Sequence, residues 1–333
     1  MALISRILAS RVFRLGFVAL TVAFGVYYIV DKWTGIHEGL DRIGLPVAIG
    51  ALACVLAALV CTMLVWRALM AGMGSPLSVP VAARVLFVGQ LGKYIPGSVW
   101  PVLAQMELAT EHKVPRARTA AASVINMCLS LLCALIVAAL TLPFTHGLQK
   151  YWWGFLIALP LVVCLYPPVL NWLLRLGFKI LRKEPPEQEL SAKPILVAMA
   201  WYIVSWTFYG LQIYVMAVRV GVNPASGLPL AIGTFALAWA IGFVIILAPA
   251  GAGFRDVMIV AVLSTQMSVG AATAIMLVSR VATTLADGIT ASVAVLSYRH
   301  NKRRQAAQAP GATVGPKEEE RAVAESPLPV REN

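Results

Sequence analysis

Long apolar runs without charged residues dominate the chain. Asp, Glu, Lys and Arg are absent from four stretches, which lie between Arg42 and Arg67, Arg118 and Lys150, Lys150 and Arg175, and Lys193 and Arg219. Each stretch has roughly 24 to 31 residues, and about 20 apolar residues suffice for a helix to cross the hydrocarbon core of a bilayer. With a shorter run near the N-terminus, the pattern predicts full spans at about residues 12–30, 45–66, 117–142, 151–174, 194–218 and 271–298.

Two further apolar segments, at about 81–112 and 229–268, are broken near their middle by Pro and Gly beside charge. The first contains GKYIPGSVW at 92–100, and the second contains APAGAGFRD at 248–256. In the first, a helix from Val81 to Tyr94 rises only about 21 Å, short of the roughly 30 Å hydrocarbon core. We therefore expect this segment to dip into the membrane and return. The second segment has room for either a dip or a full span.

These elements predict an all-α fold, a polytopic integral membrane bundle of about six full spans plus two re-entrant segments. Shifting the sequence by about 155 positions lays Pro96-Gly97-Ser98 over Gly251-Ala252-Gly253. Three predicted spans separate the two breaks, and an odd number gives the two units opposite orientations, as in inverted-repeat transporters. The alternative is a chance match, because Gly and Pro are common in membrane helices.

Composition and charge agree with a membrane protein. The chain is 59% hydrophobic and 13% charged, with a mean hydropathy of +0.80, whereas soluble domains are about 45 to 50% apolar. The net charge of +12 is spread over short loops, which favours membrane orientation over nucleic-acid binding. About 17 Lys and Arg fall on one side of the predicted topology and about four on the other. We therefore expect a plasma-membrane protein with both termini cytoplasmic.

The final stretch has a different composition. From Asn301 it carries Ala, Pro, Glu and Arg without apolar periodicity, a pattern that is typical of disorder. We expect a membrane domain at 1–300 and a disordered cytoplasmic tail at 301–333.

Catalytic signatures are missing from the sequence. The five cysteines lie inside apolar runs and the four histidines are scattered, so neither forms the spacing of a metal or redox site. We find no nucleotide-binding loop, nucleophile elbow or paired-carboxylate site. The sequence predicts no enzyme activity, no cofactor and no metal.

Charged residues beside the first break are candidates for the substrate path. Lys93 precedes the break, and Gln90 lies one turn earlier on the same helical face. With Tyr94 beside them, they offer an ammonium and an amide to a lipid phosphate or a sugar. Alternatively, Lys93 extends to the membrane surface and Gln90 only joins helices.

Charged residues at and after the second break are also candidates. Arg255 and Asp256 follow a Gly-rich turn, where free amides and a helix N-terminus favour an anion; alternatively they only cap and anchor that helix. Arg280 lies about ten residues into its span, where Arg costs roughly 2.5 to 3.5 kcal/mol on insertion scales. Asp287 lies about 10 Å further along the axis, so Asp256 is the expected partner. A purely structural ion pair is the alternative.

The complete set of candidates has two groups. The substrate-path candidates are Gln90, Lys93, Tyr94, Arg255, Asp256, Arg280 and Asp287. The backbone-break candidates are Pro96, Gly97, Pro249, Gly251 and Gly253.

The two broken segments, with the basic loop that ends in Arg118, resemble the lysylphosphatidylglycerol synthase transmembrane family, which includes the flippase half of multiple peptide resistance factor proteins. The resemblance implies a lipid moved between leaflets. It does not imply synthesis, because the aminoacyl-transfer domain of that family is a separate soluble region. The familiar Gly-Gly-x-Gly-x-Arg-Glu pattern appears here as AGAGFRD at 250–256, and Asn126 stands where many relatives have an acidic residue. These departures leave the substrate open.

Three functional hypotheses follow. The first is a flippase-like transporter of an anionic lipid or a lipid-linked sugar, whose partners are membrane lipids and not nucleic acid. The second is a non-catalytic membrane scaffold or regulator of a cell-envelope enzyme that makes glycan or lipid. The third, which the missing acid–base pair disfavours, is a membrane-embedded transferase.

Overall fold

The computed structural model describes residues 30–95, 99–145, 148–164, 166, 168–169, 171–172, 175–176, 191–244 and 253–307. These residues form helices joined by short loops, and no β-strand occurs among them. The predicted span at 12–30 lies outside the described part of the chain. The helices are α3 (Trp33–Gly72), α4 (Val79–Ala83), η1 (Arg84–Val88), η2 (Leu91–Tyr94), α5 (Trp100–Thr110), α6 (Arg116–Thr141), η3 (Leu142–Phe144), η4 (Gln149–Tyr151), α7 (Gly154–Cys164), α9 (Ala192–Arg219), α10 (Pro224–Val244), α11 (Phe254–Leu263) and α12 (Val269–Ala307).

Five of the described helices are long and apolar enough to cross a membrane: α3, α6 continued by η3, α9, α10 and α12. Four of them correspond to the spans predicted at 45–66, 117–142, 194–218 and 271–298. The fifth, α10, is the first arm of the second broken segment, and its 21 residues rise about 31 Å. In the predicted span at 151–174, α7 covers only Gly154–Cys164. The structure thus confirms an all-helical multi-pass protein.

Helix α3 begins well before the predicted residue 45. Gly44 adopts φ 64° and ψ 164° inside it, and Pro46 follows. A positive φ is easily reached only by glycine, and proline removes a backbone donor, so the helix bends at this point. The predicted span begins at about residue 45, whereas the structure shows a kink at Gly44 within a longer helix.

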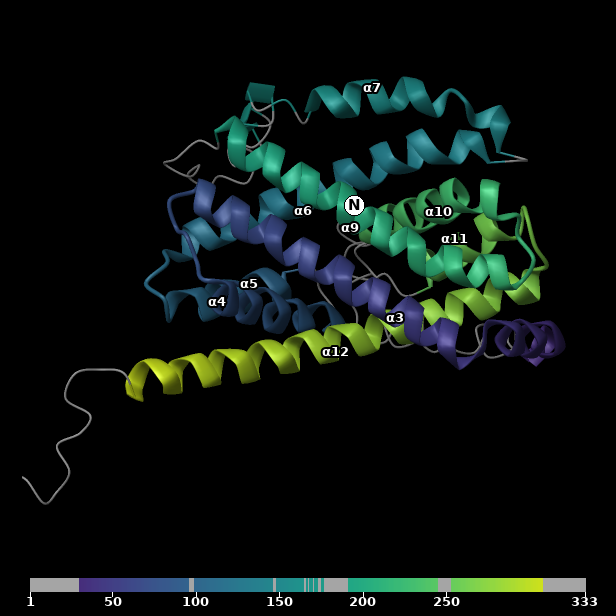
Figure 1. Ribbon diagram of the computed structural model, residues 1–333. Helices are drawn as coiled ribbons and strands as arrows, with labels where there is room; N and C mark the ends of the chain where they lie inside the picture. The colour runs from purple at the N-terminus through teal and green to yellow at the C-terminus, as the bar shows by residue number, and fades with distance from the viewer. Residues whose placement is uncertain are drawn as a thin grey trace, which may run out of the picture.

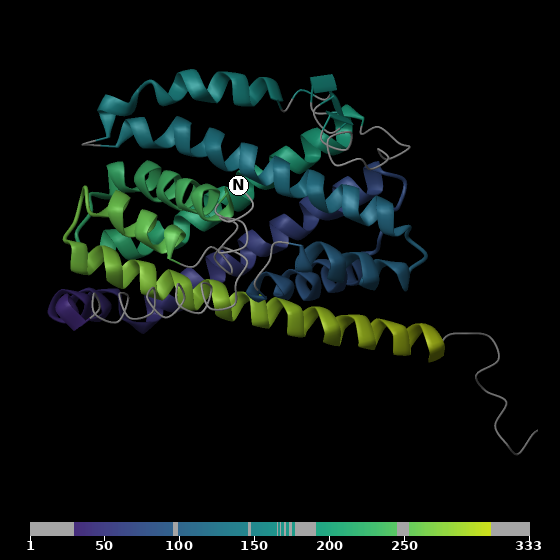
Figure 2. The same cartoon turned by 180° about the vertical axis from the view of Figure 1, so that it is seen from behind.

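Small residues set the close packing of the long helices. Helix α3 packs against α9 and α12, and α6 packs against α9 and α10. A Cβ at Gly39 would lie 2.8 Å from the Cβ of Ala274, and Gly35 lies opposite Gly270. Such positions let helix backbones approach in a membrane. Because these residue numbers rise together, α3 and α12 run in the same direction side by side (Figures 1 and 2).

The two arms of the first broken segment pack against each other. A Cβ at Gly89 would lie 2.5 Å from Cγ of Gln105, and one at Gly92 would lie 2.9 Å from the backbone N of Pro101. The backbone therefore turns back between η2 and α5. A π-helical turn at η1 precedes it, a feature often found at functional sites.

The two broken segments occupy opposite ends of the bundle. In Figures 1 and 2, α4 and α5 lie at the end where the C-terminal part of α12 projects, and α10 and α11 lie at the other end. Short loops explain this placement. Helix α3 ends at Gly72 close in sequence to α4, and α5 is followed closely by α6; in the same way, α9 leads directly into α10, and α11 into α12.

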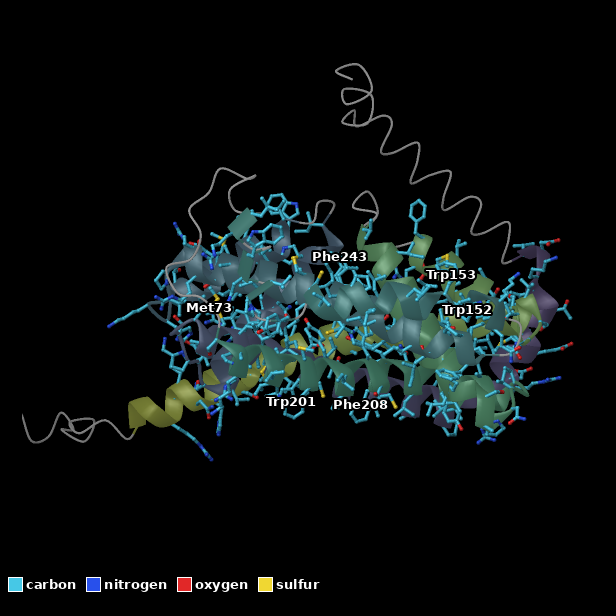
Figure 3. All side chains as sticks on the ribbon, turned by 90° about the horizontal axis from the view of Figure 1, so that it is seen from above. Met73, Trp152, Trp153, Trp201, Phe208 and Phe243 are labelled. Atoms are coloured by element: carbon cyan, nitrogen blue, oxygen red, sulfur yellow. The ribbon has the colours of Figure 1, made fainter. Side chains whose placement is uncertain are left out.

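Outer surfaces of the bundle are apolar. In Figure 3, Trp201 and Phe208 lie along one edge of the bundle, on α9. They are seven residues apart, so they share a helical face. Trp152 and Trp153, before α7, are also exposed. Apolar exposure of this kind suits side chains that face lipid.

Helix α12 continues through Ala307, past residue 300, where we expected ordered structure to end. Residues 301–307, NKRRQAA, include Lys, Arg, Gln and Ala, which favour helix, so the helix extends beyond its apolar part. The remainder of the predicted tail, 308–333, lies outside the described residues.

Candidate functional site

Lys93 and Tyr94, at the end of the first arm, both contact Asp287 on α12. The Lys93 ammonium lies 2.7 Å from Oδ2 of Asp287, and the Tyr94 hydroxyl donates a 2.7 Å hydrogen bond to the same oxygen. The Asp287 residue is only 7% exposed. A buried carboxylate needs such partners, because transfer of a charge out of water is costly. An ion pair and a hydrogen bond therefore connect the first broken segment to α12.

Asp256, at the start of α11, links the second break to the same helix. The Asp256 Oδ2 atom accepts a 3.1 Å hydrogen bond from the backbone N–H of Gly253, which has φ 85°. This bond caps the N-terminus of α11. The other oxygen, Oδ1, lies 3.7 Å from a guanidinium nitrogen of Arg280 on α12. The partner that we expected for Arg280 is thus in place.

Arg255 lies beside this pair and forms no ion pair with a carboxylate in the described part of the chain. Its guanidinium carbon lies 4.6 Å from the centre of the Phe235 ring on α10, a cation–π contact. Phe235 in turn stacks on Tyr209 of α9, with ring centres 4.8 Å apart. The Nε atom of Arg255 is buried and has no hydrogen-bond partner among the residues that the structure describes.

Helix α12 brings the two breaks to one place. Arg280 and Asp287 lie seven residues apart on it, which places them on one face about 10 Å apart along the axis. Arg280 contacts α11, and Asp287 contacts η2. Tyr94 also lies beside Thr284 and within electrostatic range of Arg280. The contacts from both breaks thus form one group, which we call the central cluster: Lys93, Tyr94, Arg255, Asp256, Arg280 and Asp287.

The central cluster carries an excess of positive charge. Three cationic side chains, Lys93, Arg255 and Arg280, face two carboxylates, Asp256 and Asp287, which leaves a net charge of +1. Arg255 is within electrostatic range of both carboxylates and of Arg280. One further negative charge would balance the group.

Of the predicted substrate-path residues, six meet in the central cluster. Gln90 does not join these contacts; it is half-buried and precedes η2 as its N-cap. Among the backbone-break candidates, Gly253 is described, whereas Pro96, Gly97, Pro249 and Gly251 lie outside the described residues. Sequence reasoning missed Phe235 and Tyr209, because an aromatic residue in an apolar helix carries no signal of a cationic partner.

A second group of charges, the basic-end cluster, lies where α5 ends and α12 projects. Arg84 donates hydrogen bonds of 2.6 and 3.0 Å to the two oxygens of Glu111 and lowers the pKa of that carboxyl. The same guanidinium lies 4.4 Å from the ring centre of Tyr298 on α12. The ring of His112 meets Tyr298 edge-on, and burial lowers the His112 pKa. These contacts hold the base of the first broken segment to α12.

The described residues contain no group of His, Cys, Asp and Glu that suits a metal ion. The free cysteines among them are separate, and none is paired in a disulfide.

Long apolar helices around a buried charged centre define a polytopic helical membrane protein. The family model described as "Lysylphosphatidylglycerol synthase TM region" matches residues 18–290, so the chain belongs to this family. The match covers both broken segments and every residue of the central cluster, and it confirms the resemblance inferred from the sequence. No curated protein and no solved structure matches the chain.

Proposed function

We propose that this protein moves a lipid with an anionic phosphate headgroup between the leaflets of the plasma membrane. One observation carries the proposal: the two broken segments meet α12 in a cluster of net charge +1, where Arg255 forms no ion pair with a carboxylate of the described residues. Ionisable residues at membrane depth are costly, and they commonly mark a substrate path. Membership of the family supports a role in lipid handling.

In the proposed topology, the two broken segments are re-entrant and enter from opposite sides. The first enters from the end of the bundle that carries the basic-end cluster. In this proposal that end is cytoplasmic, because Lys and Arg are in excess there. The second enters from the other side through α10, and α11 returns. The 21 residues of α10 are long enough to cross the hydrocarbon core, but with 10 residues α11 rises only about 15 Å, half of that core, so in this proposal the segment as a whole returns to the side from which it entered. Both termini are then cytoplasmic.

The order and contacts of the helices support an inverted repeat. Each half has a long helix, a broken segment and a second long helix: α3, 79–110 and α6 in the first, and α9, 224–263 and α12 in the second. The contacts are reciprocal, because α12 packs on η1 and η2 of the first half, and α6 packs on α10 of the second. Many transporters bind substrate where such halves meet.

The central cluster supplies the interactions that translocation needs. A phosphate that enters between the two breaks would accept hydrogen bonds from Arg255 and Lys93, which are shorter and stronger than neutral ones. Its acyl chains would stay in the surrounding lipid. While the phosphate is absent, Asp287 holds Lys93 in place, so that the ammonium is not left unpaired. This mechanism involves no covalent step.

Translocation by the purified protein in liposomes tests the proposal. Fluorescent phosphatidylglycerol in the inner leaflet becomes accessible to a membrane-impermeant quencher only if it crosses. We expect the wild-type protein to accelerate crossing and Arg255→Gln to abolish most of the gain. Arg219→Gln, which removes an exposed charge at the end of α9, serves as the matched control and should behave as wild type. Equal rates in Arg255→Gln and wild type would contradict the proposed role of this arginine.

A further inference from the structure

The C-terminal part of α12 has two faces with different neighbours. On the first face, Ala291 and Ala294 are buried against the bundle. Tyr298 contacts the basic-end cluster, and Lys302 lies within electrostatic range of Glu111. Steps of three or four residues keep these positions on one side of a helix. This side of α12 therefore packs on the protein.

The opposite face of α12 carries an exposed apolar stripe. Its large side chains are Leu285, Ile289, Val293 and Leu296, which again recur every three or four residues. In Figures 1 and 2, the C-terminal part of the helix projects from the bundle. An apolar stripe on the outside of a membrane-spanning helix faces the acyl chains of lipids.

Three arginines continue the apolar stripe where it ends. Arg299 and Arg303 follow Leu296 by three and seven positions, and Arg304 follows Val293 by eleven, so all three lie on or beside the same face. From Leu296 to Arg303 the helix rises about 10 Å. The guanidinium groups are thus placed at the depth of lipid headgroups, directly beyond the acyl chains that the stripe contacts.

The charge of these arginines is not balanced by nearby carboxylates of the fold. All three are exposed, and none forms an ion pair with another residue in the described part of the chain. The sequence has no Asp or Glu between Asp287 and Glu318. Glu111 lies on the bundle side of α12 and is paired with Arg84. The lipid side of the helix end therefore presents cations alone.

We propose that Arg299, Arg303 and Arg304 form a surface site for the phosphate headgroups of anionic phospholipids in the adjoining leaflet. Guanidinium groups bind phosphate oxygens in pairs, and basic residues beside a membrane span are attracted to anionic lipid. The site is separate from the central cluster and does not depend on translocation. Because α12 also carries Arg280 and Asp287, lipid bound here would hold in place the helix that joins both breaks.

Photo-cross-linking at the apolar stripe tests this site. The purified full-length protein, with benzoylphenylalanine in place of Leu296, is reconstituted in liposomes of equal phosphatidylglycerol and phosphatidylcholine with matched acyl chains. Mass spectrometry then measures the two lipids attached at this position. We expect phosphatidylglycerol to be favoured about five-fold or more, as attraction by one or more arginines requires. Equal attachment of the two lipids would overturn the proposal.

A second cross-linking position controls for general enrichment of anionic lipid around the protein. Ile203 on α9 is 59% exposed and lies in the charge-free run between Lys193 and Arg219. Benzoylphenylalanine in its place should attach the two lipids almost equally. A preference for phosphatidylglycerol as large as at position 296 would overturn the proposal, because the arginines of α12 would then not be its source.

Adjacent residues on opposite faces supply the matched variants. Arg303→Gln should lower the preference at position 296 several-fold, and neutralisation of all three arginines should abolish it. Arg303→Lys, which keeps the charge, should retain most of it. Lys302→Gln removes the same charge from the bundle side and should change the preference little. An equal loss in Lys302→Gln and Arg303→Gln would overturn the assignment to the lipid side.

The acidic stretch Glu318–Glu320 of this chain is the competing occupant of the arginines. Replacement of all three glutamates by Gln should leave the preference of the wild-type arginines for phosphatidylglycerol almost unchanged. If the preference were absent with the glutamates present and emerged only after their replacement, the arginines would bind this stretch, and the proposal would be overturned.

Discussion

The central cluster and the basic-end cluster use the same residue types in different surroundings. In the central cluster, Asp287 is 7% exposed and its partners come from a segment nearly two hundred residues away. Beside the basic-end cluster, Glu107 and Arg116 pair with each other, nine residues apart in sequence, and their side chains are 69% and 60% exposed. Water screens the exposed Glu107–Arg116 pair more than the buried carboxylate of Asp287, so equal distances between charges have unequal consequences.

This difference assigns different roles to the two clusters. Exposed pairs contribute little to stability, typically about 0 to 1 kcal/mol. Buried pairs are costly to form, and the removal of one partner leaves a stranded charge. We therefore expect mutations to separate the two clusters clearly.

The largest effect should follow the loss of the Asp287 carboxylate. Asp287→Ala leaves the Lys93 ammonium without its partner, so the free energy of unfolding should fall by about 3 kcal/mol. This value is at the lower end of the range for broken buried ion pairs, because Lys93 is partly exposed. Thermal unfolding in detergent measures the change. Lys93→Ala combined with Asp287→Ala should recover much of the loss, since no charge is stranded. A double variant no more stable than the single one would contradict this explanation.

A smaller loss should follow an added methyl group between the two arms of the first break. A Cβ at Gly92 would lie 2.9 Å from backbone atoms of Trp100 and Pro101, which cannot move aside without opening the turn. Gly92→Ala should therefore cost about 1 to 3 kcal/mol.

Gly50→Ala on α3 is the matched control, because a Cβ there meets no atom within 4 Å. It should be neutral or stabilising by up to about 1 kcal/mol, since alanine favours helix. Thermal unfolding measures the change in stability of Gly92→Ala and of Gly50→Ala. If both substitutions changed stability in the same direction, the close approach at Gly92 would not be required.

The Arg84–Glu111 pair should contribute a modest, pH-dependent amount. Its Glu111 side chain is 48% exposed, so Glu111→Gln should cost no more than about 1 kcal/mol at neutral pH. Because the folded-state pKa of Glu111 is lowered from 4.5, the contribution is present above that value and is lost as pH falls through the folded-state pKa. The difference in melting temperature between wild type and Glu111→Gln should therefore vanish in acid. A difference in melting temperature that grows as the pH falls would contradict this expected pH dependence.

The smallest effect should come from the exposed Glu107–Arg116 pair beside the basic-end cluster. Glu107→Gln removes the partner of Arg116, and both side chains remain in water, so stability should change by less than about 0.5 kcal/mol. A loss comparable to that of Asp287→Ala, measured in the same detergent, would remove the distinction between the two clusters.

Sequence reasoning reached the local features of the site and missed the long-range ones. Pro, Gly and helix length located the breaks, and a central Arg280 required a partner, which the structure provides as Asp256. The contact of Lys93 with Asp287 was not predictable, because helical periodicity gives the face of each residue but not which distant helix lies opposite. The helix before Gly44 was also not predicted, because the expected span at 45–66 rested on the charge-free run after Arg42, whereas α3 begins at Trp33 among charged residues.

The central claim is that the central cluster binds a lipid phosphate through Arg255, and lipid retained on the purified protein tests it most directly. Native mass spectrometry of wild type, Arg255→Gln and Arg219→Gln, purified in parallel from the same membranes, measures the bound lipid. The account predicts an anionic phospholipid on wild type and Arg219→Gln that is largely lost from Arg255→Gln. Equal retention of the same lipid by all three proteins would contradict it.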